Sequence, residues 1–155
     1  MRSVRMKEEI VELLDSAIYK EIASESLYLA VREKTDDAGA RELMQELALE
    51  EKKHSQWITT LRDKGATRSW HKGAIMDLKI GEHLSAPDHL EGAGLQDTLI
   101  FAIKREQQSV EFYSRMMGAM RTQRGKKLCM RMAGEELRHK LKLEILFDDL
   151  FLGED

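Results

Sequence analysis

Apolar residues recur at alternating steps of three and four along four long stretches of this chain. In the first stretch the stripe passes through Leu14, Ala17, Tyr28 and Val31, and three further stretches follow the same rule. This spacing gives a helix one apolar face. A single Pro in 155 residues also favours helix throughout. The pattern predicts helices over about 7–34, 38–64, 95–121 and 125–151, which is typical of an all-α four-helix bundle.

The lengths of the connections predict how these helices are arranged. Residues 35–38 and 122–125 are short links, which force the helices on either side into antiparallel hairpins. Residues 65–94 are long enough to return along the whole bundle, about 40 Å at ~1.5 Å per helical residue. We therefore expect two hairpins joined by a long crossover, with the second and third helices parallel. Residues 74–81 are expected to cover one side of the bundle.

The two predicted hairpins are copies of each other. A shift of 85 positions, without a gap, brings identical residues together along the helices. The repeat predicts a pseudo-two-fold axis between the hairpins. The identical pairs include Ala17/Ala102, Ile18/Ile103, Glu21/Glu106, Ser24/Ser109, Tyr28/Tyr113, Leu43/Leu128, Ala48/Ala133, Glu50/Glu135, Glu51/Glu136 and His54/His139.

Six residues on the apolar stripes are ionisable. A buried carboxylate without a partner costs several kcal/mol, so a core position is an unusual place for one. Exposure to solvent is a poor explanation, because each of the six has apolar neighbours three or four residues away. An ion-pair network is a poor explanation too, because the stripes carry no Lys or Arg. The six are Glu21, Glu51, His54, Glu106, Glu136 and His139.

Two divalent cations would neutralise the four glutamates. Carboxylate oxygen together with neutral imidazole nitrogen suits iron, manganese or zinc better than magnesium or calcium. The spacing Glu51-x-x-His54, repeated as Glu136-x-x-His139, places both side chains of each pair on one helical face. One such pair is weak evidence, but two at the same repeat offset predict a site for two metals. Without metal we expect the pKa of some of the glutamates to be raised, so that they keep their protons at pH values above the ordinary pKa of glutamate.

Two pairs of neighbouring residues leave their roles open. Tyr28 and Tyr113 could hydrogen-bond the glutamates of the site, or they could only pack in the core. Glu50 and Glu135 could support the site from outside, although their position favours a solvated helix face.

Composition and charge narrow the class of protein. A net charge of -3 with interspersed charges provides no basic field for nucleic acid, and no stretch approaches the ~20 apolar residues of a membrane span. We expect a single domain over residues 1–155 in the reducing cytoplasm. We also expect a homo-oligomer, a dimer, because one apolar end could pack against a partner. That end consists of Leu146, Phe147, Leu150 and Phe151.

Four segments carry a resemblance to a known family: AIYKEIASESLY, LALEEKKH, AIKREQQSVEFY and MAGEELRH. They resemble the helix motifs of the ferritin-like di-iron carboxylate proteins, and within these the rubrerythrin-type branch, over about residues 8–150. The resemblance implies a ferritin-like bundle with two iron ions, for which manganese or zinc could substitute. It also implies that the six stripe residues are the metal ligands and the catalytic site. The implied roles are bridges for Glu51 and Glu136, terminal ligands for Glu21 and Glu106, and one metal each for His54 and His139.

The chain departs from that branch in two ways. Rubrerythrins carry an added rubredoxin-type domain whose iron is bound by four cysteines, and this chain has Cys129 alone. They also have a further carboxylate one turn after the third-helix ligand, where this chain has Ser109. The resemblance therefore implies electrons from a separate donor protein.

Three functions are compatible with such a site. The resemblance favours an oxidoreductase that acts in the response to oxidative stress and in which two Fe(II) ions reduce hydrogen peroxide or dioxygen. One alternative is a ferroxidase that passes iron to a store or a partner. Another is a metal-binding module without catalysis.

Overall fold

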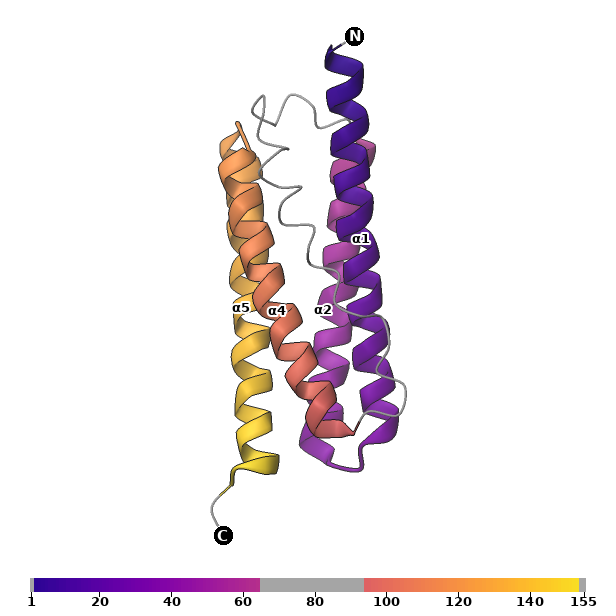
Figure 1. Cartoon of the computed structure of the whole chain (residues 1–155), viewed down its shortest axis with the longest axis vertical. Coiled ribbons are helices and arrows are strands. Elements are labelled where there is room, and N and C mark those ends of the chain that lie inside the picture. The colour runs from indigo at the N-terminus through magenta and orange to yellow at the C-terminus, as the bar shows by residue number, and fades with distance from the viewer. Residues whose placement is uncertain (1, 65–93, 154–155) are drawn as a thin grey trace.

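The computed structural model describes residues 2–64 and 94–153, with side chains from residue 8 onward. The described chain folds into four long helices (Figure 1). They are α1 (Arg2–Lys34), α2 (Ala38–Asp63), α4 (Leu95–Ala119) and α5 (Gln123–Phe151). All four predicted helices are confirmed, although α1 begins earlier than predicted. The link between α4 and α5 also lies earlier than predicted, at residues 120–122.

Capping side chains explain where two of the helices begin. The Asp37 carboxylate accepts a hydrogen bond from the Ala40 N–H at 2.8 Å, which starts α2. The Thr122 hydroxyl accepts one from the Gly125 N–H at 3.0 Å, which starts α5. Position 125 suits glycine, because a Cβ there would lie 3.0 Å from both Met120 Sδ and Thr122 Oγ1. The tight turn between α4 and α5 therefore depends on Thr122 and Gly125 together.

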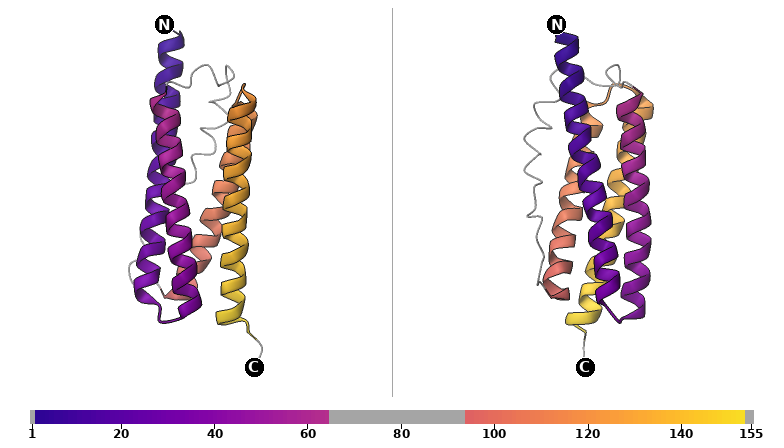
Figure 2. Two further views of the ribbon diagram at one scale, coloured as in Figure 1. Left: turned by 180° about the vertical axis from the view of Figure 1, so that it is seen from behind. Right: turned by 90° about the vertical axis from the view of Figure 1, so that its right-hand side faces the viewer.

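The helices form two antiparallel hairpins, α1 with α2 and α4 with α5, as the short links predict (Figure 1). The C-terminal end of α2 and the N-terminal end of α4 lie at opposite ends of the bundle, so these two helices run parallel (Figure 2). This is the expected arrangement of two hairpins joined by a crossover. The segment predicted to cover the bundle, residues 74–81, lies outside the described residues.

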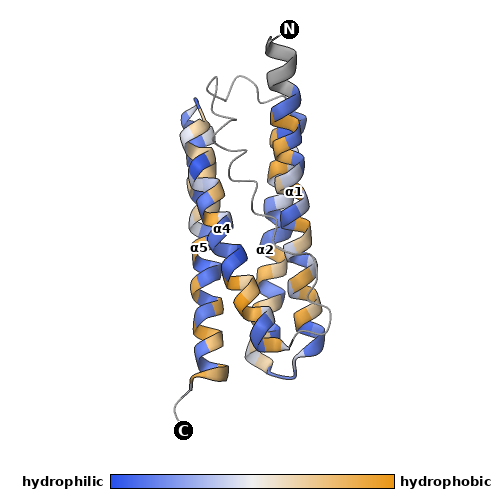
Figure 3. Cartoon of the chain, in the orientation of Figure 1, coloured by the Kyte–Doolittle hydropathy of each residue, from blue (hydrophilic) through white to orange (hydrophobic). Residues whose placement is uncertain are grey.

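Buried apolar side chains gather in two clusters, one toward each end of the bundle. One cluster includes Leu14 of α1 and Met132 of α5, and the other includes Leu47 of α2 and Leu99 of α4. Apolar and polar residues alternate along every helix, as the stripes predict (Figure 3). Between the two clusters lies a layer of buried ionisable side chains, so the apolar core is interrupted at mid-height.

The apolar C-terminal end folds mostly onto the protein's own core. Leu146, Phe147 and Leu150 pack against the second apolar cluster, while Phe151 remains 36% exposed. The dimer therefore stays a prediction. In the stretches that the structure describes, none of the helices combines the length and the apolar character needed to cross a bilayer.

The packing of the first cluster can be tested by truncating one leucine. Leu14→Ala should lower the free energy of unfolding by about 2–5 kcal/mol, because the side chain is fully buried and its loss leaves a cavity. Leu49→Ala is the matched control, since Leu49 is 51% exposed and should change stability by less than about 0.5 kcal/mol. Urea denaturation followed by circular dichroism measures both. Equal losses for the two variants would contradict the packing.

Candidate metal centre

Six ionisable side chains from all four helices meet in the layer between the apolar clusters. Each is at most 3% exposed, so the prediction that they lie in the core is confirmed. α1 and α4 each contribute a glutamate, and α2 and α5 each contribute a glutamate and a histidine. They are Glu21, Glu51, His54, Glu106, Glu136 and His139.

These side chains form two groups that could each hold a metal ion. The first group is Glu21, Glu51, His54 and Glu136, and the second is Glu51, Glu106, Glu136 and His139. Within each group, one ligand atom from every residue lies within 4.8 Å of the others. Glu51 and Glu136 belong to both groups, which is the arrangement that two bridging carboxylates require.

The contacts inside the layer follow the pseudo-two-fold axis. His54 Nδ1 lies 2.6 Å from Glu136 Oε1 and 3.7 Å from Glu21 Oε2. The repeat-related distances are 2.8 Å from His139 Nδ1 to Glu51 Oε1, and 3.7 Å from the same nitrogen to Glu106 Oε2. The two imidazole rings stack with their centroids 6.0 Å apart. The predicted two-fold relation between the hairpins thus extends to individual atoms.

The chemistry of this layer fits a pair of cations. Four buried atoms of the layer make no hydrogen bond of good geometry in the described chain, although His54 Nδ1 and Glu136 Oε1 lie 2.6 Å apart. They are Glu21 Oε2, Glu106 Oε2, Glu136 Oε1 and His54 Nδ1. Leaving such groups unpaired costs about 1–3 kcal/mol each. A cation surrounded by these oxygens and nitrogens would satisfy them all. Carboxylate oxygen with imidazole nitrogen suits first-row transition metals.

Each histidine uses its other nitrogen to contact a glutamate outside the layer. His54 Nε2 lies 2.5 Å from Glu135 Oε2, and His139 Nε2 hydrogen-bonds to Glu50. If Nε2 donates its proton to the outer glutamate, Nδ1 is free to face the cluster as a metal ligand. The interpretation of Glu50 and Glu135 as residues of a solvated face is therefore wrong. Their recurrence beside both ligand glutamates was the signal in the sequence.

The two tyrosines hydrogen-bond the site, which the sequence left open. The Tyr28 hydroxyl donates to Glu106 Oε1, and the Tyr113 hydroxyl donates to Glu21 Oε1. Each tyrosine reaches the glutamate of the other hairpin instead of the one on its own helix. One oxygen of each terminal glutamate is thereby fixed, while the other faces the cluster without a hydrogen bond.

The electrostatics of the metal-free layer favour retained protons. Burial raises the pKa of Glu51 and Glu136 well above its usual range, and neighbouring carboxylates raise it further. Burial alone would lower the pKa of His54, but contacts with Glu21 and Glu135 outweigh it and raise the pKa to about 9. The pKa of His139 is raised in the same way. These groups hold protons in the space where cations would lie.

Glu21 titrates in the opposite direction from Glu51 and Glu136. Burial would raise the pKa of Glu21, but its contacts with Glu51 and His54 and the charge of His54 together lower it. The expected protonation of the glutamates is thus concentrated on the two shared residues. The terminal Glu21 remains ionised beside the histidine.

The two halves of the site differ in their outermost residues. Arg131 contacts Glu135 at 3.3 Å and lies 4.7 Å over the ring of Trp57. At the positions related by the repeat, an ion pair joins Glu46 and Lys142. These residues were not singled out from the sequence, because exposed charges on helices carry no ligand spacing.

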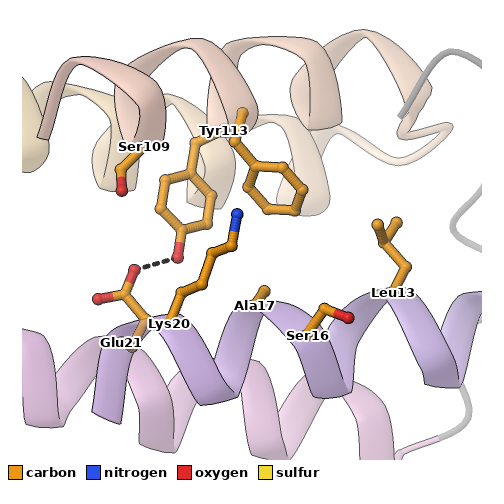
Figure 4. A pocket seen from close by; sticks show the side chains of 8 residues that line it. Leu13, Ser16, Ala17, Lys20, Glu21, Ser109 and Tyr113 are labelled. Atoms are coloured by element: carbon orange, nitrogen blue, oxygen red, sulfur yellow. Dashed lines mark hydrogen bonds between the residues drawn. The ribbon is translucent and has the colours of Figure 1, made fainter. Parts of the chain in front are cut away.

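Two cavities reach the layer from different sides. A cavity of about 20 Å³, large enough for about one water molecule, lies between α1 and α4 and reaches Glu21 (Figure 4). Ser109 and Tyr113 point into it from α4, opposite Ala17 of α1 (Figure 4). A larger one of about 280 Å³ lies between α2 and α5 and reaches His54. Ser109 thus occupies a place beside the site where a further carboxylate would have pointed.

The first hairpin matches a known family. The model of the family described as Rubrerythrin matches residues 12–71. This range contains Glu21, Glu51 and His54, which are one repeat's share of the site. No curated protein and no solved structure shows a significant match to the chain.

The stability of the metal-free protein should fall as pH rises from about 5 to about 9. Glu51, Glu136, His54 and His139 all have raised pKa values, so the folded state binds more protons than the unfolded state in this window. Glu21, whose pKa is lowered, acts in the opposite sense and only toward acidic pH. Thermal melts of chelator-treated protein across this range measure the trend.

A double variant provides the control for this pH dependence. Replacing both Glu51 and Glu136 by Leu should raise the melting temperature of the metal-free protein at pH 8 and flatten the curve, because two buried carboxyls no longer need protons. A parent protein that is more stable than the variant across the whole range would mean that these carboxylates do not repel one another.

The outer glutamates should support metal binding without being ligands. Glu135→Ala should weaken the affinity for Co(II) by about 10–100-fold, because His54 loses the partner that orients its ring. Glu144→Ala is the matched control, since Glu144 also lies on α5 and also pairs with a cation four residues away, Lys140, at 3.5 Å. Titration followed by visible absorption measures both affinities. Similar affinities for the two variants would show that Glu135 has no such role.

Proposed function

We propose that the buried layer binds two iron ions and reduces hydrogen peroxide or dioxygen. The match of residues 12–71 to the family described as Rubrerythrin supports this proposal. The electrons come from an external donor protein. One observation carries the proposal: two overlapping groups of three carboxylates and one histidine share Glu51 and Glu136. Glu21 and His54 would complete one iron position, and Glu106 and His139 the other.

Each iron ion bound in this layer would supply one electron in passing from Fe(II) to Fe(III). Two ions would therefore supply the two electrons that, with two protons, convert one hydrogen peroxide into two water molecules. The four carboxylates match the charge of two divalent ions, so the loaded layer is close to neutral in the buried bundle.

The residues around the layer hold its ligands in place. Tyr28 and Tyr113 each fix one oxygen of a terminal glutamate, and Glu50 and Glu135 orient the histidines. Apolar clusters above and below exclude bulk water from the layer. A rigid, dry ligand set of this kind favours chemistry on a small substrate over exchange of the metals.

The cavities favour a small neutral oxidant over incoming iron. The cavity between α1 and α4 has room for about one water-sized molecule and is lined mainly by apolar atoms. The cavity between α2 and α5 carries three cations, Lys53, Arg131 and Arg138, against two glutamates. Neither of these two routes is predominantly acidic, as a path for Fe(II) would be. This supports peroxide or dioxygen reduction over the ferroxidase alternative.

Iron loading followed by oxidant tests the proposal. Under anaerobic conditions the protein should take up two Fe(II) per chain; peroxide should then produce a ferric charge-transfer band that an added reductant removes, over repeated cycles. The variant with both Glu51 and Glu136 replaced by Leu is the control and should show neither uptake nor cycling. A ferric mineral that grows with each addition would identify the ferroxidase instead, and protein that binds no iron would leave a module without this redox chemistry.

A further inference from the structure

We propose that a cationic groove between α2 and α5 docks an acidic one-electron carrier protein, and that Trp57 links this groove to the metal layer. The inference rests on the proposed function, because it names the side on which the external donor binds. The groove is defined by Lys64, Arg124, Lys127 and Arg131 around an apolar floor that includes Trp57 and Leu61.

The groove is large and its ionisable lining is all of one sign. It has a volume of about 640 Å³ and lies between the C-terminal half of α2 and the N-terminal half of α5. Its four charged lining residues are cations, and none of the described lining residues is acidic. Arg131 contacts Glu135 on the side of the metal layer. Its apolar floor and charged rim are the usual composition of a protein-binding site.

One of these cations lies where a helix disfavours it. Arg124 is in the first turn of α5, which contains no acidic residue. The helix dipole makes this end partially positive, so a cation there is destabilising and a carboxylate would be stabilising. An acidic partner would reverse the sign of that interaction. The position is therefore better explained by binding than by the stability of the isolated chain.

The internal repeat shows that the fold does not demand these charges. At the positions related by the shift of 85, the opposite end of the bundle carries acidic or neutral residues in place of the groove cations. The same backbone positions thus accept positive, negative or neutral residues. The related pairs are Lys64/Asp149, Arg124/Gly39, Lys127/Glu42 and Arg131/Glu46, and Trp57 corresponds to Lys142.

The groove is connected to the metal layer through one aromatic ring. Trp57 lines both this groove and the smaller cavity beside His54, and its ring centroid lies 6.4 Å from that of His54. Arg131 covers the Trp57 ring from the groove side at 4.7 Å. Trp57 thus gives an electron that arrives in the groove an aromatic path to His54, which is itself part of the layer. The repeat-related end has Lys142 at this position and offers no equivalent ring.

Overall charge would orient the partner. The chain carries a net charge of -3, which gives a small overall repulsion of an acidic protein, whereas the four cations of the groove attract it. Each docking event delivers one electron. Two docking events therefore supply the two electrons that, with two protons, reduce one hydrogen peroxide to two water molecules. An open groove with long cationic side chains at its rim suits a protein surface of carboxylates.

Binding of an acidic probe protein tests the groove independently of catalysis. The probe is an acidic plant-type ferredoxin, and its affinity is measured by calorimetry with metal-free and with iron-loaded protein. Lys127→Glu should weaken binding by about 3–10-fold at low ionic strength, and the difference should vanish at high salt. Lys104→Glu is the matched control, because it changes the net charge equally on an exposed α4 lysine outside the groove. Ferredoxin that does not bind, or equal losses for both variants, would overturn the proposal.

A second variant separates docking from electron transfer. At saturating ferredoxin, Trp57→Leu should slow re-reduction of the oxidised iron, while reduction by dithionite stays at the parent rate and Trp57→Phe restores part of the loss. Measuring the rate at saturation separates electron transfer from any change in affinity, because Trp57 also lines the groove. If the protein binds no iron, the proposed function fails, and the affinity results still decide the docking. Sedimentation showing self-association that Lys127→Glu abolishes would assign the groove to a second copy. Saturable binding of inorganic pyrophosphate without ferredoxin binding would assign it to a small anion. Either result would overturn the proposal.

Discussion

The mutual repulsion of four glutamates in one buried layer is the constraint on which the rest of this structure depends. Glu21, Glu51, Glu106 and Glu136 cannot all be ionised there without cations among them. In the metal-free protein the raised pKa values of Glu51, Glu136 and the two histidines supply protons instead. Metal binding at this layer would therefore be coupled to folding, because the same carboxylates destabilise the bundle when they are ionised without cations among them.

The same layer holds the two hairpins together. The hydrogen bonds from Tyr28 to Glu106 and from Tyr113 to Glu21 both cross from one hairpin to the other, as do the contacts of His54 and His139 with the outer glutamates. The apolar clusters supply most of the burial above and below. The polar contacts fix the relative position of the hairpins, since they are satisfied only in one register. The contacts that complete the site are thus also contacts between the hairpins.

Symmetry inside the layer contrasts with asymmetry around it. The contacts of the two histidines with glutamates of the other hairpin have counterparts under the repeat, but Trp57 and Arg131 are replaced by Lys142 and Glu46 on the other side. The inner residues are buried and contact one another across the two hairpins. The outer residues face solvent and are free to differ, so the two ends of the bundle can meet different molecules.

The helices, their pairing into hairpins and the burial of the six central residues could all be predicted from the sequence. Helical periodicity places residues three and four apart on one face, so Glu51 and His54 had to point inward together, and the repeat doubled the evidence. The tertiary structure alone decided which atoms meet. Tyr28 binds Glu106 instead of Glu21 on its own helix, Glu135 contacts His54 across the bundle, and the pKa of Glu21 is lowered while burial raises that of Glu51. Each of these depends on how the hairpins dock, which local periodicity does not encode.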